Sequence, residues 1–179
     1  MKKDFIRLSG ILCVITLVAA LLLAWVNSLT KTKIAEAANK ASEEAMQSIM
    51  TDAKDFKKVT DTVYECSANG KMIGYCVTVT EKGFGGDIVM MVGIDCEEKV
   101  RGIEVLSHSE TPGLGAKMTT DDFKKRFCGK NTELSVVKTP TKSPDEVQAI
   151  TGATITSRAA AKGVSDARLQ IEEAKGENR

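Results

Sequence analysis

At 179 residues the chain is long enough for one folded domain with an appendage. Its 25 basic residues nearly balance 24 acidic ones, and the charges are interspersed, so no basic stripe for a nucleic-acid partner is present. The five cysteines are scattered without a C-x-x-C pair, beside a single histidine. Zinc and iron–sulfur sites need clustered ligands, so we expect no metal and interpret the cysteines as small buried apolar residues.

The first predicted element is a membrane-spanning helix within residues 1–30. Residues 8–29 carry no charge, and at about 1.5 Å per residue they reach about 33 Å, enough to cross a bilayer core of about 30 Å. The alternative is a cleaved signal peptide, whose apolar region spans only about 7–15 residues and ends in a small-x-small site. Residues 24–26 (AWV) do not supply such a site, so we expect an uncleaved, single-pass anchor in contact with membrane lipid.

Basic residues near the two ends of the anchor suggest its orientation. Lys2, Lys3 and Arg7 precede the anchor together with the free amino terminus, whereas Lys31 and Lys33 follow it. Lysine and arginine concentrate on the cytoplasmic side of membrane helices. We therefore expect a cytoplasmic N-terminus and a folded domain on the extracytoplasmic side of the plasma or inner membrane.

A connecting segment over residues 31–58 follows the anchor. Its alanines have high helix propensity, and Glu36 and Lys40 form an i,i+4 pair in the favourable order. This pattern predicts a helix over residues 31–56 that joins the anchor to the folded domain.

Two hairpins begin the predicted domain, which covers residues 59–179. Asn69-Gly70, the strongest short hairpin signal, separates predicted strands at 62–66 and 72–80. A charged turn separates two more strands at 88–95 and 100–106; the first starts with five apolar residues, typical of a strand buried on both faces. A short helix, two strands and a final helix follow, over residues 120–127, 134–138, 147–150 and 158–175. This order indicates an α+β domain with a mostly antiparallel sheet flanked by helices.

Residues 151–157 (TGATITS) lie where an apolar strand gives way to the final helix. The first N–H groups of a helix have no internal partner and lie at the positive end of the helix dipole, which suits a phosphate. Gly152 and Ala153 leave room for a bulky group to approach Thr154. Hydroxyls before a helix also serve as N-caps, and these residues alone leave both interpretations open.

Two glycine-containing segments suggest places where the backbone approaches a ligand. Residues 110–115 (ETPGLG) have a turn signature in which Gly113 can adopt positive φ and Gly115 allows close approach. An ordinary surface turn is the alternative. Residues 83–86 (GFGG) do not form a G-x-G-x-x-G motif followed by a helix, so a dinucleotide site is not expected.

The histidine and three methionines have both a functional and a structural interpretation. His108 could transfer protons, but we expect a solvated or capping histidine. Met90, Met91 and Met118 could line a cofactor slot, although core filling is the usual role of methionine. No nucleophile–base pair is apparent, so we expect no catalytic residue.

The chain resembles RnfG, the covalent-FMN-binding G subunit of the Rnf electron transport complex. The resemblance is carried by three segments that follow one apolar segment in this order: residues 83–95, 107–117 (SHSETPGLGAK) and 151–157. The C subunit of the Na+-translocating NADH:quinone reductase is related. The resemblance implies FMN joined through its phosphate to Thr154 by an FAD-dependent flavin transferase. The family pattern often has an acidic residue three positions before the motif, where this chain has Gln148.

The resemblance also implies the remaining site residues and the function. The residues around the phosphate are Thr151, Gly152, Ala153, Thr156 and Ser157, with the last two hydroxyls bonding phosphate oxygens. The flavin-pocket residues are Gly85, Glu110, Thr111, Gly113 and Leu114, with Leu114 packed on the ring. The chain would be an electron-transfer subunit of a membrane-bound, ion-translocating ferredoxin:NAD+ oxidoreductase, with its other subunits as partners and no turnover alone. The alternatives are the C subunit of the quinone reductase and a membrane-anchored binding or assembly domain that never receives flavin.

Overall fold

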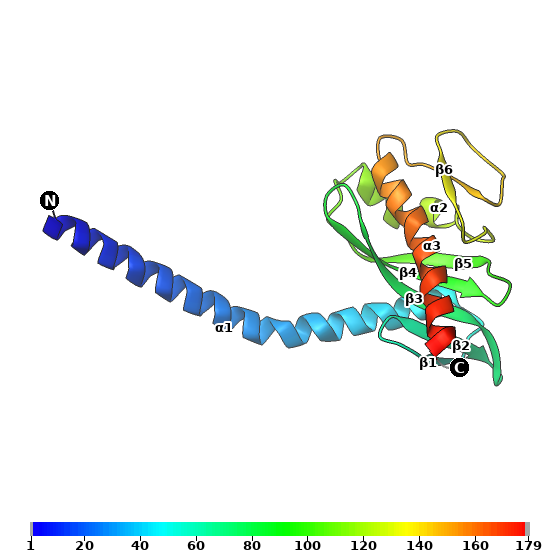
Figure 1. Cartoon of the computed structure of the whole chain (residues 1–179), viewed down its shortest axis with the longest axis horizontal. Helices are drawn as coiled ribbons and strands as arrows, with labels where there is room; N and C mark the ends of the chain where they lie inside the picture. Colours follow the sequence, from blue (N-terminus) through cyan, green and yellow to red (C-terminus); the bar gives the residue numbers. More distant parts are fainter. Residues whose placement is uncertain (1, 178–179) are drawn as a thin grey trace. The chain divides into compact units, whose positions relative to one another are not determined.

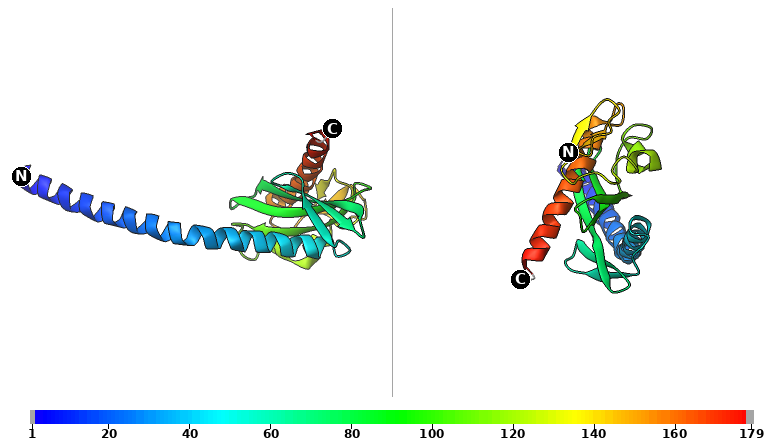
Figure 2. Two further views of the ribbon diagram at one scale, coloured as in Figure 1. Left: turned by 90° about the horizontal axis from the view of Figure 1, so that it is seen from below. Right: turned by 90° about the vertical axis from the view of Figure 1, so that its right-hand side faces the viewer.

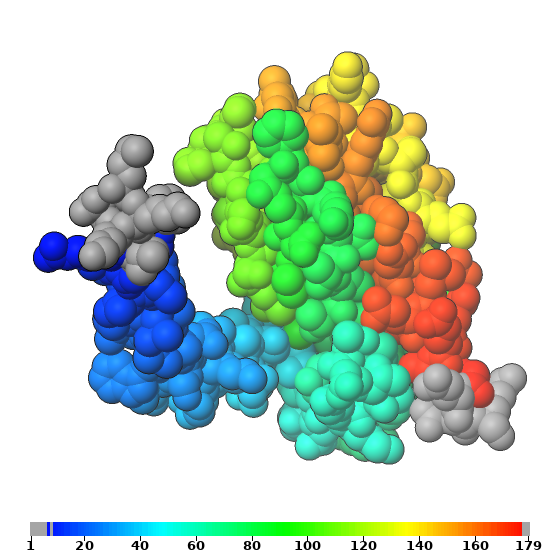
Figure 3. All heavy atoms as spheres, turned by 60° about the vertical axis from the view of Figure 1, so that its left-hand side comes forward, coloured from blue at the N-terminus to red at the C-terminus, as the bar shows by residue number. Residues whose placement is uncertain are grey.

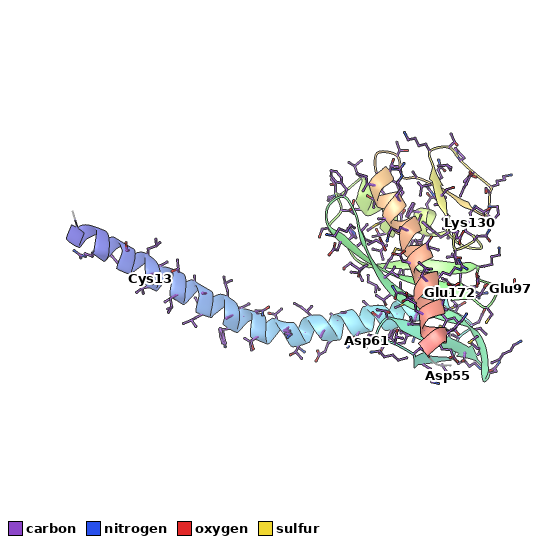
Figure 4. The ribbon with its side chains drawn as sticks, viewed as in Figure 1. Cys13, Asp55, Asp61, Glu97, Lys130 and Glu172 are labelled. Atoms are coloured by element: carbon purple, nitrogen blue, oxygen red, sulfur yellow. The ribbon has the colours of Figure 1, made fainter. Side chains whose placement is uncertain are left out.

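The computed structural model describes residues 2–177 of the chain. The chain divides into two compact units, Met1–Lys40 and Ala41–Arg179, and helix α1 (Lys2–Ile49) runs from the first into the second. In the first unit, apolar side chains such as Leu12 and Leu23 are exposed all along the helix, and Figure 4 labels Cys13 among them. Within residues 2–177, one helix is long and apolar enough to cross a membrane.

The last residues of α1 are part of the folded unit. Ala45, Met46 and Ile49 are buried, so they do more than connect the anchor to the domain. The prediction of a helix up to residue 56 was wrong: α1 ends at Ile49, and Phe56 lies in strand β1 (Asp55–Lys58). The apolar positions at the end of α1 pack on the sheet, and the chain must turn there to enter the first strand.

An antiparallel sheet forms the centre of the second unit. Within the described residues its strands follow one another in chain order, as Figure 1 shows: β1, β2 (Val63–Ala68), β3 (Lys71–Lys82), β4 (Asp87–Asp95) and β5 (Val100–Ser107). Both predicted hairpins are confirmed by the strand pairing. Asn69 and Gly70 have φ angles of 52° and 77°, as expected for the tight hairpin turn that this pair favours.

Helices cover both faces of the sheet, as the two views in Figure 2 show. Met90 and Val92 of β4 face helix α3 (Thr154–Glu177) in the larger core. Met91, between them, packs on the opposite face in a smaller core that includes Ile49 of α1. The prediction that this strand is buried on both faces is therefore confirmed.

Small elements connect β5 to α3. They are the 3-10 helix η1 (Gly115–Thr119), helix α2 (Asp121–Lys124), and the parallel strand pair β6 (Ser135–Val137) and β7 (Glu146–Gln148). The helix predicted over 120–127 is regular only to Lys124. Beyond it the chain continues as turns, in which the N–H groups of Arg126 and Phe127 donate to carbonyl oxygens three residues earlier. The predicted α+β class is confirmed, but the final helix begins at Thr154 rather than at 158.

Candidate functional site

The chain turns sharply between β7 and α3, and this turn presents Thr154. Gly152 has a φ of 81°, a conformation that glycine adopts without steric cost. The N–H of Ala153 donates to the carbonyl oxygen of Ile150 over 2.9 Å and closes the turn. Thr154 follows as the first residue of α3 and is half-buried. Its hydroxyl has no hydrogen-bond partner among residues 2–177.

Three backbone N–H groups at the start of α3 are free. The carbonyl oxygen of Ala153 accepts the first helical hydrogen bond, from the N–H of Ser157 at 3.0 Å, so Ala153 is the N-cap residue. Alanine has no side-chain oxygen to cap the first turn. In the described part of the chain, the N–H groups of Thr154, Ile155 and Thr156 have no partner. The N-cap interpretation of the hydroxyls is therefore wrong, and the helix start can bind an anion.

The hydroxyls of Thr156 and Ser157 point into the protein, where they are 1% and 0% exposed as residues. Thr156 donates to Oε2 of Glu110 over 2.7 Å. Ser157 Oγ donates to the carbonyl oxygen of Ala153 and accepts the N–H of Ile150, each over 2.9 Å. Both hydroxyls therefore bond to the protein, whereas the role of phosphate ligand requires them to be free.

Glu110 joins three segments that are far apart in the sequence. Its Oε1 accepts the N–H groups of Phe84 and Gly85 over 2.7 and 2.9 Å, while its Oε2 accepts the Thr156 hydroxyl. Burial raises the pKa of the Glu110 carboxyl, but these hydrogen bonds and the nearby His108 outweigh it and hold the pKa below its usual value. Glu110 is therefore a buried carboxylate that fixes the loop at 83–86, its own turn and the first turn of α3.

Glycines make this close approach possible. A Cβ at Gly115 would lie 2.8 Å from the Thr156 hydroxyl, and one at Gly85 would lie 2.8 Å from the carbonyl carbon of Ser109. Gly113 differs from these residues, since its Cβ would meet nothing within 4 Å but its φ is 79°. Gly113 is therefore required by backbone conformation, as predicted, and the other two by lack of space.

A cleft of about 380 Å³ lies beside Thr154. Its rim contains three apolar side chains that remain exposed: Phe84 at 71%, Leu114 at 46% and Ile155 at 52%. Figure 3 shows how the segments that carry them meet at one end of the domain, in green, yellow-green and orange. Exposed apolar groups around a concave, partly polar site are typical of the binding site of a small organic ligand.

The cleft contains most of the predicted site residues. The predicted residues that line it are Glu110, Thr111, Leu114, Gly152, Ala153, Thr154 and Thr156. Thr151, Gly113, Gly85 and Ser157 are not among its lining residues. Sequence reasoning missed Phe84 and Ile155, whereas Gly115, which was expected to allow close approach, does line the cleft. The available signal for Phe84 was its position as an aromatic residue between two glycines.

Gln148, which replaces the acidic residue of the family pattern, approaches this turn through its backbone. Its carbonyl oxygen accepts a hydrogen bond from Nη1 of Arg126 over 3.0 Å, and the Arg126 guanidinium is held by Asp122 over 2.6 Å. Arg126 also lies 5.6 Å from the centre of the Phe123 ring. The strand leading to the turn is thus fixed at its backbone.

The histidine and the methionines have structural roles. Nδ1 of His108 accepts the N–H of Glu110 over 3.1 Å, so the expectation of a capping histidine is confirmed. Met90, Met91 and Met118 are fully buried, and the expectation of core filling is confirmed. Among the cysteines, Cys66 and Cys76 are buried, whereas Cys13, Cys96 and Cys128 are exposed, contrary to the interpretation of all of them as buried.

The uncapped helix start, the free threonine hydroxyl and the apolar-rimmed cleft together define a cofactor-binding domain attached to an apolar N-terminal helix. Two family models match this chain: the FMN-binding domain over residues 83–168 and the RnfG N-terminal region over residues 1–49. The chain belongs to the RnfG family, the G subunits of Rnf-type ion-translocating oxidoreductase complexes.

Relatives of similar length support this assignment. The G subunit of the proton-translocating ferredoxin:NAD(+) oxidoreductase complex of Clostridium ljungdahlii is 33% identical over 156 residues, covering 86% of this chain and 84% of the relative. The G subunit of the Na(+)-translocating ferredoxin:NAD(+) oxidoreductase complex of Acetobacterium woodii is 36% identical over 186 residues, covering 91% and 89%.

Two solved structures share the fold of the domain. NqrC of Shewanella oneidensis is 20% identical with a TM-score of 0.52, covering 64% of this chain and 65% of that one. The C subunit of the Na(+)-translocating NADH-quinone reductase of Parabacteroides distasonis is 25% identical with a TM-score of 0.51, covering 59% and 57%. The chain thus spans less than two thirds of each solved chain, and the shared fold agrees with the relationship to the quinone reductase that the sequence indicated.

Proposed function

We propose that this chain is the FMN-carrying electron-transfer subunit of an Rnf-type ferredoxin:NAD+ oxidoreductase complex, with FMN joined through its phosphate to Thr154. The observation that carries this proposal is the start of α3. Thr154 presents an unbonded hydroxyl there, next to three N–H groups without partners in the described chain. A phosphoester at that hydroxyl would be anionic, and free N–H groups at a helix start stabilise an anion.

The cleft supports a place for the flavin ring. Phe84, Leu114 and Ile155 supply apolar surface at its rim, and the exposed Thr111 supplies a hydroxyl for the polar edge of the ring. FMN supplies the electron-transfer chemistry when bound. The residues of the chain bind the phosphate, orient the ring and exclude water from one side of it, and Glu110 holds the loops that carry them.

The attachment reaction requires the predicted flavin transferase as a partner and FAD as the donor. The Oγ–P bond of Thr154 forms as the diphosphate bond of FAD breaks, AMP leaves, and the hydroxyl proton passes to a base of the transferase. The half-exposed position of Thr154 leaves its hydroxyl accessible to a second protein. A covalent tether also keeps the cofactor at high local concentration in a compartment where free flavin is dilute.

The membrane arrangement completes the proposal. Helix α1 would cross the membrane once, and the domain would lie on the extracytoplasmic side, where the other Rnf subunits contact it. This orientation is supported by the basic residues before the anchor. Ferredoxin and NAD+ would react at other subunits of the complex.

Intact-mass measurement tests the proposal. The full chain, co-expressed with a flavin transferase and purified in detergent, should gain the mass of one FMN less one water. The same chain expressed without the transferase should keep its unmodified mass. An unmodified mass in both preparations would contradict the proposal and favour an anchored binding or assembly domain without flavin.

A further inference from the structure

The Ser157 side chain makes two hydrogen bonds to the backbone of the turn that precedes α3. Its hydroxyl accepts the N–H of Ile150 from before the turn and donates to the carbonyl oxygen of Ala153, both over 2.9 Å. The side chain is fully buried, so it contacts neither solvent nor the cleft. It therefore closes the loop of residues 150–153 from inside the helix, using no N–H group of the first turn.

A helix start is normally fixed in the opposite way. A Ser, Thr, Asp or Asn at the N-cap accepts the N–H of the second or third helical residue, which here would be Ile155 or Thr156. Such a cap would occupy the N–H groups that a phosphate on Thr154 requires. Ala153 at the N-cap avoids this competition, but it leaves the turn without the hydrogen bond that usually holds it. The two bonds of Ser157 replace that missing constraint.

We propose that Ser157 is a positioning residue for flavin attachment, and that it acts together with Ala153 to keep the first turn of α3 both ordered and uncapped. The inference rests on the proposed function, since it assigns Ser157 a part in presenting Thr154. Ser157 does not touch the phosphate. It holds the Gly152 turn, and with it the helix start that carries the Thr154 hydroxyl and the free N–H groups.

The first test measures the initial rate of flavin transfer from FAD to the detergent-solubilised chain, at varied chain concentration. Ser157→Ala should lower kcat about tenfold or more, because two buried hydrogen bonds that place the reacting hydroxyl are lost. KM for the chain should stay near the wild-type value, because the Ser157 hydroxyl is buried. Ser157→Thr retains a hydroxyl and should recover much of the rate.

Ser165→Ala is the matched control. Ser165 is also on α3, and its hydroxyl donates to the carbonyl oxygen of Thr132 over 2.9 Å, away from the turn. It should leave the transfer rate unchanged. Hydrogen exchange gives a second readout, since the Ile150 amide should exchange faster in Ser157→Ala and at the wild-type rate in Ser165→Ala.

Ala153→Ser separates positioning from stability. A serine at the N-cap should raise Tm by roughly a few degrees, as N-caps do, yet slow flavin transfer by occupying a free N–H group. A merely structural role for this turn predicts that stability and transfer rise together. The inference is overturned if Ser157→Ala matches the wild-type kcat, if Ser165→Ala is equally slow, or if Ala153→Ser transfers flavin faster. No transfer to the wild-type chain would instead overturn the proposed function.

Discussion

The hydroxyl of Thr156 donates a 2.7 Å hydrogen bond to Oε2 of Glu110, 46 residues earlier in the chain, and both residues are buried. The other carboxylate oxygen accepts two N–H groups from the loop at 83–86. One side chain therefore connects the helix start that presents Thr154 to both loops that line the cleft. This relationship makes Glu110 the residue whose loss should disturb the whole site.

Glu110→Gln should lower the free energy of unfolding by about 2 kcal/mol. A glutamine carbonyl oxygen can replace one carboxylate oxygen, but the amide NH2 then faces a donor that was bonded to the other. Thermal unfolding of the detergent-solubilised chain at neutral pH measures this difference. Equal stability of the variant and the wild type would contradict the assigned hydrogen bonds.

The difference in stability between the wild type and Glu110→Gln should depend on pH. The pKa of Glu110 in the folded chain lies below its ordinary value of 4.5. Between these two pKa values, unfolding of the chain is therefore accompanied by the uptake of a proton on Glu110. The carboxylate therefore contributes its stability above pH 4.5 and loses it as the pH drops through the lowered folded pKa. The stability difference between wild type and Glu110→Gln should shrink below about pH 4.5, and a difference that grows there would show the opposite shift.

Thr154→Ala should abolish covalent flavin, because it removes the hydroxyl that forms the phosphoester. Fluorescence of the chain on a denaturing gel under ultraviolet light reads covalent flavin directly. Thr151→Ala is the control, since Thr151 is exposed and does not line the cleft, and this variant should retain flavin. A fluorescent Thr154→Ala band would move the attachment site to another hydroxyl.

Phe84→Ala should change the flavin spectrum without changing the flavin content. Phe84 is 71% exposed, so its loss costs little stability, but it removes apolar surface from the rim where the ring would lie. The absorption band of the flavinylated chain should shift. Leu169→Ala, which removes an exposed apolar side chain elsewhere on α3, should leave the band unchanged; identical spectra for all three proteins would place the ring outside this cleft.

Gly93→Ala should destabilise the domain by about 1–3 kcal/mol, the usual effect of overpacking a core. Its Cβ would overlap Cγ2 of Ile49, where the end of α1 packs on the sheet. Gly102, the direct cross-strand neighbour, would place a Cβ at an ordinary 3.6 Å from the same atom. Gly102→Ala should therefore be tolerated. Equal Tm values for the two variants would contradict the prediction and show that the Ile49 side chain can move aside at little cost in stability.

Cysteine labelling should report the side of the membrane on which the domain lies. Cys96 and Cys128 are exposed, whereas Cys66 and Cys76 are buried. A membrane-impermeant thiol reagent should label the chain in intact cells, and replacing Cys96 and Cys128 by serine should remove this signal. Labelling that appears only after lysis would place the domain in the cytoplasm.

The sequence by itself determined the features that depend on neighbouring residues. The length of the uncharged run predicted the apolar N-terminal helix. Asn69-Gly70 predicted the position of the first hairpin, because this pair tolerates the φ angles that its turn requires. The apolar run at the start of β4 identified a strand buried on both faces. The TGATITS motif marked the region where α3 starts, although the helix begins at Thr154 rather than at 158.

Only the tertiary structure decided which hydroxyls are free. Thr154, Thr156 and Ser157 are close neighbours with similar side chains, yet Thr156 bonds to Glu110 and Ser157 bonds within the turn, while Thr154 has no partner in the described chain. The end of α1 was placed in a similar way, by its contact with Gly93. A hydroxyl's partner depends on which distant segments the fold brings within about 3 Å of it, and local patterns of propensity and polarity carry no information on that distance.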